Sequence, residues 1–316
     1  MGARAMKQLA SFSLYSLAVR RPKEPTNLAV ARHLLRSIYP AATNLTTLVG
    51  GEMTQAYAFE AEGEQLVLRV NSHFGYDRDL WVGKLIDRRA VPFPAVLAAG
   101  ETEGKFWAVS RRAPGTIVWD FTVADQRRLV PQMIAILQAI HATDISAFHG
   151  FGPVRDDGNG TDSTWATYLR QSVLRDNLQN VKRASARAPT DVKGLLETLV
   201  GTAYQLLPDE PPRSLIHRDF NLANILAVNG SVTGVIDWQG VGYGDASYDA
   251  AWTDFWSPHL GFASAYGVAI GQVDWRARVR CYQLLMAARS IAFFVNTDQL
   301  GRAEMPLTRG RALLGP

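Results

Sequence analysis

Cysteine is almost absent from this sequence of 316 residues, which contains a single one, Cys281. One cysteine cannot form an internal disulfide, and it cannot supply a cluster of thiolate ligands for a metal. Cys281 begins the mostly apolar run 281–288, which predicts a buried helical position. So little cysteine fits a reducing compartment, and we expect a cytoplasmic protein.

Long apolar runs are also missing. No stretch of 18 or more apolar residues occurs, so the sequence predicts no membrane span and no membrane partner. Residues 1–20 combine basic residues with an apolar stretch that serines dilute, a weak match to a targeting peptide without an evident cleavage site. We therefore expect an N-terminal helix or a frayed tail there.

Runs of Lys and Arg are missing as well, although the formal net charge is +4. Scattered basic residues without interleaved aromatics are typical of a solvated surface, so we expect no nucleic-acid partner. The charge is distributed unevenly, because residues 217–275 contain one basic residue and six aspartates. An acidic segment in a basic protein suits Mg²⁺ and a cationic substrate.

The composition, 47% hydrophobic and 20% charged, is ordinary for a globular protein with a sizeable core. The first 110 residues alternate strand patterns with inserted helical ones. Helices are predicted at 27–40 and 77–90, and strands at 48–59 (interrupted by a turn), 65–70 and 105–110.

The pattern becomes mostly helical after Pro114-Gly115, which breaks both periodicities. Helices are predicted at 123–141, 164–182, 192–206 and from 246 onward, with short strands in 213–238 and a loop at 150–162. A small strand-rich part before a larger helical part predicts an α+β chain with two lobes, 1–112 and 113–316.

The strongest motif runs from His217 through Asp219 to Asn224, between two apolar segments. The spacing H-R-D-x-x-x-x-N is typical of the catalytic loop of kinase-like phosphotransferases. Asp219 would orient the nucleophilic hydroxyl and accept its proton. Asn224 would offer Mg²⁺ a neutral oxygen. Taken alone, both residues could be turn residues.

A second motif follows 18 residues after Asp219, where Asp237 ends the apolar strand 232–236. This is the position of the metal-binding aspartate of phosphotransferases, which bridges Mg²⁺ to the β- and γ-phosphates. A turn or cap role for Asp237 is the alternative. The coincidence of two motifs, two spacings and two flanking strands favours the chemical interpretation.

The N-terminal part is then expected to hold the nucleotide. Gly50 and Gly51, with backbone amides up to Thr54, could cover the phosphates, although a plain hairpin turn is an equal alternative. Arg69 occupies the strand position where kinases place a lysine for the α- and β-phosphates. Asp79 is predicted to orient Arg69, with Asp77 as the alternative, and either could instead be a first-turn carboxylate that the helix dipole favours.

Residues 110–113, including Arg111 and Ala113, are predicted from position alone to be a hinge whose backbone meets the adenine. Asp245 and Asp249 lie near the start of the last helical region. We predict a capping role for them, with bracing of the catalytic loop as the alternative.

These motifs resemble the aminoglycoside phosphotransferase family, and within it the branch acting on hygromycin B. The resemblance covers about residues 27–300 and rests on four kinds of segment: 217–226, 236–238 with 244–245, 54–59 with 67–72, and 109–115 with 150–153. Arg69 and the Asp-Trp pair at 237–238 match this branch.

The resemblance implies a two-lobed protein-kinase-like fold with a small antiparallel-sheet lobe and a larger helical lobe. It implies an ATP-dependent kinase, with Mg²⁺ and without excluding GTP, that confers resistance by phosphorylating an aminoglycoside. It assigns the base role to Asp219 and metal ligation to Asn224 and Asp237. We expect a monomer.

The acceptor stays open at this stage. Arg218 and residues 220–223 depart from the small and polar residues of the branch, next to the base. Possible contacts to a cationic antibiotic are Asp156, Asp157, Trp238 and Trp256. A kinase for a macrolide, sugar or metabolite, or a nucleotide-binding regulator without turnover, are the alternatives.

Overall fold

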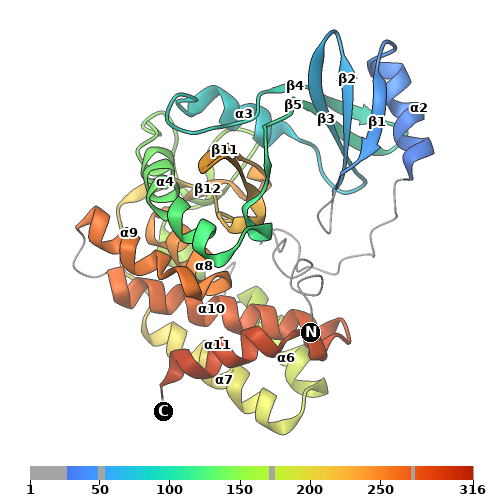
Figure 1. The fold of residues 1–316 in the computed structure, drawn as a ribbon. Coiled ribbons are helices and arrows are strands. Elements are labelled where there is room, and N and C mark those ends of the chain that lie inside the picture. Colours follow the sequence, from blue (N-terminus) through green and yellow to red (C-terminus); the bar gives the residue numbers. More distant parts are fainter. Residues whose placement is uncertain (1–26, 49–53, 171–174, 272–274, 316) are drawn as a thin grey trace. The chain divides into compact units, whose positions relative to one another are not determined.

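The structure is a computed structural model that describes residues 27–48, 54–170, 175–271 and 275–315 (Figure 1). The chain forms two compact units, and each is built from separate stretches of sequence. Unit 1 contains the chain up to Ala139 together with Leu222–Gly240. Unit 2 contains Ile140–Asn221 and Val241–Pro316. The proposed catalytic loop therefore crosses from unit 2 into unit 1 between residues 221 and 222.

Unit 1 begins with a helix packed on a five-stranded antiparallel sheet of order β1-β2-β3-β5-β4 (Figure 1). The elements are α2 (Leu28–Ile38), β1 (Thr43–Thr47), β2 (Gln55–Ala61), β3 (Glu64–Asn71), α3 (Asp77–Leu85), β4 (Val96–Thr102) and β5 (Lys105–Arg111). Alternate residues of β3, Leu66, Leu68 and Val70, are buried in one core with Leu34 and Leu35 of α2. Since side chains alternate along a strand, Arg69 points to the opposite face of the sheet.

A second, smaller sheet completes unit 1, with the order β11-β10-β6. Its elements are β6 (Thr116–Ile117), β10 (Ile225–Val228) and β11 (Ser231–Val235), accompanied by α4 (Val123–His141). Gly115 enters this sheet at φ +92°, where an added Cβ would lie 2.2 Å from the carbonyl oxygen of Ala227. Only glycine fits that approach, which explains the Pro-Gly break in the sequence pattern.

Unit 2 consists of a four-stranded sheet, order β8-β7-β12-β9, and a group of helices. The strands are β7 (Phe151–Val154), β8 (Gly160–Asp162), β9 (Arg213–Ile216) and β12 (Gly242–Asp245). The helices are α5 (Trp165–Tyr168), α6 (Arg175–Arg187), α7 (Thr190–Gln205), α8 (Ser247–Trp256), α9 (Phe262–Ile270), α10 (Trp275–Asn296) and α11 (Glu304–Leu314). Helix α10 is central, since it contacts α6, α7, α8 and α11 (Figure 1).

The predicted α+β fold class with a small antiparallel sheet and a larger helical part is confirmed. Cys281 lies buried on α10, as predicted. Within the helix predicted at 164–182, the structure has α5 at Trp165–Tyr168 and the start of α6 at Arg175, and residues 171–174 lie outside the described residues. The loop predicted at 150–162 contains β7 and β8, and β4 was not predicted at all. The division at 112/113 stays a prediction.

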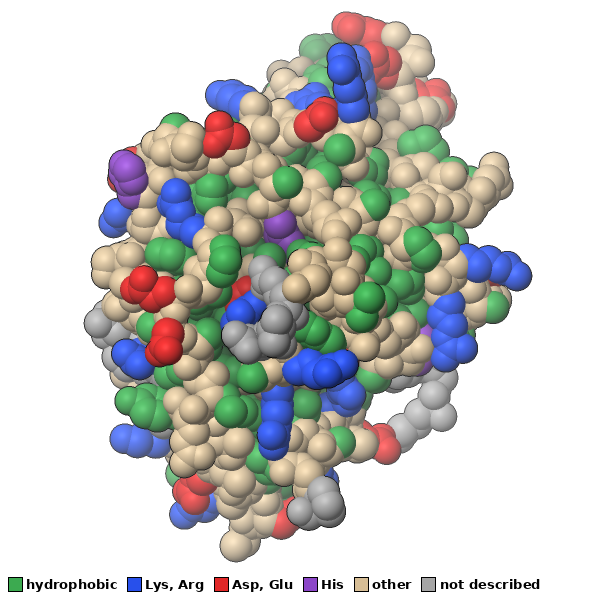
Figure 2. All heavy atoms as spheres, turned by 90° about the vertical axis from the view of Figure 1, so that its left-hand side faces the viewer, with side chains coloured by type: hydrophobic (Ala, Val, Ile, Leu, Met, Phe, Trp, Pro, Cys, Tyr) green, Lys and Arg blue, Asp and Glu red, His purple; other side chains and the backbone are tan. Residues whose placement is uncertain are grey.

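Among the helices of the described residues, none combines the length and the apolar character that crossing a membrane requires. On the face drawn in Figure 2, basic and acidic side chains are interspersed and do not gather by sign.

Candidate active site

The first part of the candidate site is an ion pair in unit 1. The Nη2 atom of Arg69 on β3 donates to Oδ1 of Asp79 on α3 at 2.8 Å. Both side chains are largely buried, with exposed fractions of 17% and 3%. Asp79, and not Asp77, is thus the carboxylate that orients Arg69. A buried ion pair of this kind fixes the guanidinium in place.

Burial alone would lower the pKa of Arg69, but the nearby carboxylates of Asp79 and Asp237 raise that pKa above its ordinary value. The guanidinium also lies over the ring of Tyr76, 4.7 Å from its centroid. Arg69 therefore stays charged in its buried position, as its predicted role as a phosphate ligand requires.

Gln239 links this ion pair to the segment that follows Asp237. Its Nε2 donates to Oδ2 of Asp79 at 2.6 Å. Its carbonyl oxygen accepts a hydrogen bond from Nη1 of Arg78 at 2.9 Å. Helix α3 thus holds both Arg69 and the chain just after Asp237, within one unit.

The two predicted metal ligands lie side by side in unit 1. Strands β10 and β11 pair in antiparallel fashion with Ile225 opposite Val235. The amide of Ile236 donates to the carbonyl of Asn224 at 2.9 Å. Asn224 and Asp237 therefore leave the same end of this hairpin. Asp237 has φ +65°, a conformation that aspartate tolerates better than most residues.

These two residues fit Mg²⁺ by the chemistry of their donor atoms. Carboxylate and amide oxygens are hard ligands, and Mg²⁺ is usually held by one or two carboxylates together with phosphates and water. Within the described residues, no group of three or more His, Cys, Asp or Glu side chains lies together as a metal cage.

The predicted base, Asp219, belongs to unit 2 and is 1% exposed. Its Oδ1 accepts two hydrogen bonds, each of 2.8 Å, from Nε1 of Trp252 and Nδ2 of Asn221. The carboxylate is thereby held in one orientation. Trp252 comes from helix α8, 33 residues further along the chain.

Helix α8 also holds the backbone of the catalytic loop. The carboxylate of Asp249 accepts the amides of His217 at 2.8 Å and of Arg218 at 2.6 Å. The hydroxyl of Thr253 donates to the carbonyl of Phe220 at 2.5 Å. The capping role predicted for Asp249 was wrong, and the bracing alternative is correct.

Asp249 has a third partner in His141, whose Nε2 lies 3.1 Å from Oδ2. The other ring nitrogen of His141 lies 2.5 Å from the hydroxyl of Tyr266. Asp245 accepts a hydrogen bond from the amide of Ser247 at 2.9 Å. The N-cap residue of helix α8 is Ala246, which makes no side-chain capping bond. The carboxylate of Asp245 also contacts Tyr282 and Arg278 on α10.

The catalytic motif differs from the hygromycin B branch at Arg218 and at residues 220–223, and most of these side chains are buried. Arg218 is 2% exposed, stacks 5.2 Å from the centroid of Tyr168 and donates to the Tyr168 hydroxyl. Phe220, Asn221 and Leu222 are 0% exposed. These side chains pack inside the protein, as does Asp219 between them, which is 1% exposed.

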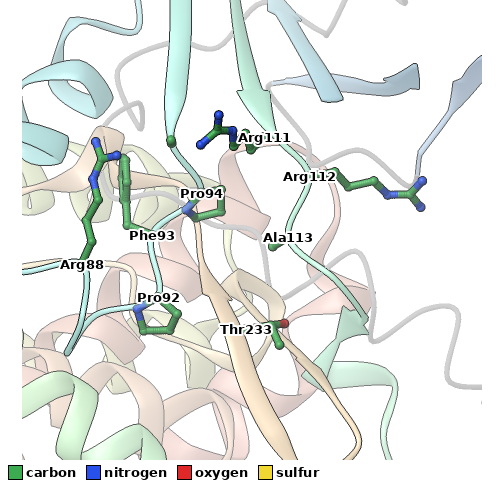
Figure 3. Close-up of a pocket in the computed structure, with 9 residues that line it drawn as sticks. Arg88, Pro92, Phe93, Pro94, Arg111, Arg112, Ala113 and Thr233 are labelled. Atoms are coloured by element: carbon green, nitrogen blue, oxygen red, sulfur yellow. The ribbon is translucent and has the colours of Figure 1, made fainter. Parts of the chain in front are cut away.

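The remaining nucleotide residues are only partly described. Gly50 and Gly51 lie outside the described residues, and Thr54 stands just before β2. Arg111 and Ala113 line a cavity of about 310 Å³ with Pro92–Ala95, Arg88, Arg112 and Thr233 (Figure 3). Arg111 also pairs with Glu64 at 3.1 Å. The adenine contact of this segment stays a prediction.

The four predicted acceptor contacts differ in exposure. Asp156 and Asp157 are exposed between β7 and β8, and the amide of Asn159 lowers the pKa of Asp157. Trp238 is 0% exposed and donates to the Val235 carbonyl, while Trp256 is 3% exposed. Burial of both indoles favours packing roles for them.

Sequence reasoning missed Gln239, Trp252 and Thr253. The one available signal was the spacing of Asp249, Trp252 and Thr253, which places all three on one face of a helix. Nothing in the sequence indicates which partner that face meets.

Comparisons with known proteins agree with this geometry. A model described as the phosphotransferase enzyme family matches residues 44–280. Hygromycin-B 4-O-kinase of Escherichia coli is 32% identical over 245 residues, which is 75% of this chain and 69% of that protein.

Two crystal structures of thermostable mutants of aminoglycoside phosphotransferase APH(4)-Ia are similar throughout. One is a ternary complex with ADP and hygromycin B, 26% identical, with a TM-score of 0.76. The other is a ternary complex with AMP-PNP and hygromycin B, 27% identical, with a TM-score of 0.76. Each match covers 89% of this chain and 97% of the other. The chain therefore belongs to the phosphotransferase enzyme family and is a small-molecule kinase.

Proposed function

We propose that this kinase transfers the γ-phosphoryl group of ATP to a hydroxyl of hygromycin B or a similar aminoglycoside, and so confers resistance. The observation that carries the proposal is the β10–β11 hairpin, which sets Asn224 beside Asp237 at the end of the catalytic motif. The relative with 32% identity acts on hygromycin B by its name. A cytoplasmic monomer remains our prediction.

In the proposed mechanism, Asp219 orients the acceptor hydroxyl toward the γ-phosphorus and takes its proton. The new O–P bond forms as the bond from the γ-phosphorus to the bridging oxygen breaks, and ADP leaves with that oxygen. Arg69, charged and held by Asp79, steadies the nucleotide phosphates. Asn224 and Asp237 would hold Mg²⁺, which would supply positive charge to offset the negative charge of the nucleotide phosphates. The exposed Asp156 and Asp157 are proposed to attract the amino groups of the antibiotic.

The test is ADP release from the purified protein with ATP, Mg²⁺ and a panel of acceptors: hygromycin B, other aminoglycosides, a macrolide and simple sugars. We expect strong stimulation by hygromycin B. Replacing Asp219 by Asn should lower kcat about 10²–10⁴-fold, the usual contribution of a general base. Asp209→Asn, at an exposed aspartate outside the site, is the matched control and should keep full activity.

Two results would contradict the proposal. Stimulation by a macrolide or sugar alone would make the acceptor wrong while leaving the kinase class intact. Near-normal turnover of the Asp219→Asn variant would remove the base role from this residue.

A further inference from the structure

Helix α8 contacts the catalytic loop residue by residue. Asp249 binds the amides of residues 217 and 218, Trp252 binds the side chain of Asp219, and Thr253 binds the carbonyl of residue 220. The three helix residues lie at positions i, i+3 and i+4, which form one face. All three are at most 2% exposed.

Trp252 is the one member of this face that reaches the reacting side chain itself. Asp249 and Thr253 bind only backbone groups of the loop. The indole Nε1–H donates to Oδ1 of Asp219 at 2.8 Å, on the same oxygen that accepts from Asn221. Because a carboxylate is rigid and planar, fixing Oδ1 from two sides also sets the direction of Oδ2.

We propose that Trp252 is a positioning residue of this kinase: its indole N–H sets the orientation of the Asp219 carboxylate for attack by the acceptor hydroxyl. The inference rests on the proposed base role of Asp219. Asn221 neighbours Asp219 in the loop and moves with it, whereas Trp252 is anchored in a buried helix. Trp252 is therefore the donor that ties the base to the fold.

The indole has a second property suited to this task. Its ring meets Trp256 edge to face at 5.8 Å between centroids, within the same helix. A large buried ring has few accessible rotamers, so the N–H direction is fixed by packing. A shorter donor in the same place would need to be held by further hydrogen bonds.

The test compares Trp252→Phe, which removes the donor and keeps an aromatic ring, with the parent enzyme. We expect kcat to fall about tenfold, while KM for ATP and for hygromycin B change less than twofold. Phe255→Leu, at a 0% exposed position of the same helix, controls for lost packing and should keep kcat. An unchanged kcat in folded Trp252→Phe would overturn the inference.

A double-mutant cycle separates positioning from general damage. If Trp252 acts through the carboxylate, adding Trp252→Phe to Asp219→Asn should slow the residual reaction less than twofold. A further tenfold loss in that background would overturn the inference, because the effect would then bypass Asp219. Full activity of Asp219→Asn alone would instead overturn the base role, and the two failures are thus distinct.

A second variant covers the case in which Trp252→Phe does not fold. Benzothienyl-alanine incorporated at position 252 keeps the shape of the indole and replaces the N–H by sulfur. The same tenfold loss of kcat is expected from that single replacement, and normal turnover would contradict the proposal.

Discussion

Arg218 carries a positive charge into the interior of unit 2, directly beside the proposed base. Its backbone adopts φ +67°, a left-handed conformation that disfavours a side chain by about 1 kcal/mol. The fold maintains this conformation through Asp249, which binds the Arg218 amide, and through Tyr168, which accepts from the guanidinium. Arg218 thus supports the loop through its contacts with Asp249 and Tyr168.

Arg218→Gly should therefore lower stability and spare acceptor binding. Glycine relieves the backbone strain of about 1 kcal/mol. The lost charge-assisted hydrogen bond contributes about 1.5–3 kcal/mol, so we expect a net loss of about 0.5–2 kcal/mol in the free energy of unfolding by urea. KM for hygromycin B should change little. A tenfold rise in that KM with unchanged stability would show that Arg218 meets the acceptor.

At the scale of elements, Asp245 is the last residue of β12 and is 1% exposed. It links the start of α8, where it accepts the amide of Ser247, to α10. Its carboxylate accepts from the Tyr282 hydroxyl at 2.7 Å and lies 2.8 Å from Nε of Arg278, whose side chain is 14% exposed. Breaking a buried ion pair by removing one partner is strongly destabilising, because the other charge stays behind.

Asp245→Asn is accordingly expected to lower the free energy of unfolding by about 3 kcal/mol. Adding Arg278→Met removes the stranded cation and should recover part of that loss. Denaturant unfolding of the two single variants and the double variant gives the coupling between them. Additive losses would mean that the ion pair contributes nothing to the packing of α8 on α10.

The elements also differ in how far sequence predicts them. The catalytic motif was identified because Asp219, Asn224 and Asp237 lie close together along the chain, in a pattern set by their chemistry. The contact between Asp219 and Trp252 depends on tertiary packing, so no local pattern reveals it. The strand β4 was missed because its Ala-Ala-Gly centre has low strand propensity, and pairing with β5 supplies what propensity does not.

At the scale of the whole molecule, buried thiol and phenol groups that are neutral at pH 7 limit the stability of the fold at alkaline pH. Burial raises the pKa of Cys281 to about 12, from an ordinary value of 9.0. Burial likewise raises the pKa values of Tyr248, Tyr266 and Tyr282. Each group keeps its proton in the fold and loses it in the unfolded chain, so stability must fall as pH rises above about 9.

The contribution of Cys281 to this fall in stability with pH can be measured by itself. Between its unfolded and folded pKa values the free energy of unfolding falls by about 1.4 kcal/mol for each pH unit, or about 2 kcal/mol at pH 10.5. Urea unfolding at pH 7.5 and 10.5 should show this loss in addition to that from the tyrosines. Cys281→Ala should remove that part of the pH dependence, and an identical slope in the variant would refute the assignment.

The interleaving of the two units constrains how such an enzyme can be recombined. The chain passes between units at 139/140, 221/222 and 240/241. A chimaera with one crossover after residue 112 would draw β5 and β6 of unit 1 from different parents, although the core of that unit was selected as a whole. Transplanting unit 2 from a relative intact requires two cassettes, 140–221 and 241–316, with the short segment 222–240 retained. A gene library built on those three junctions would exchange the base together with its supporting helix, while the nucleotide residues stay those of the host.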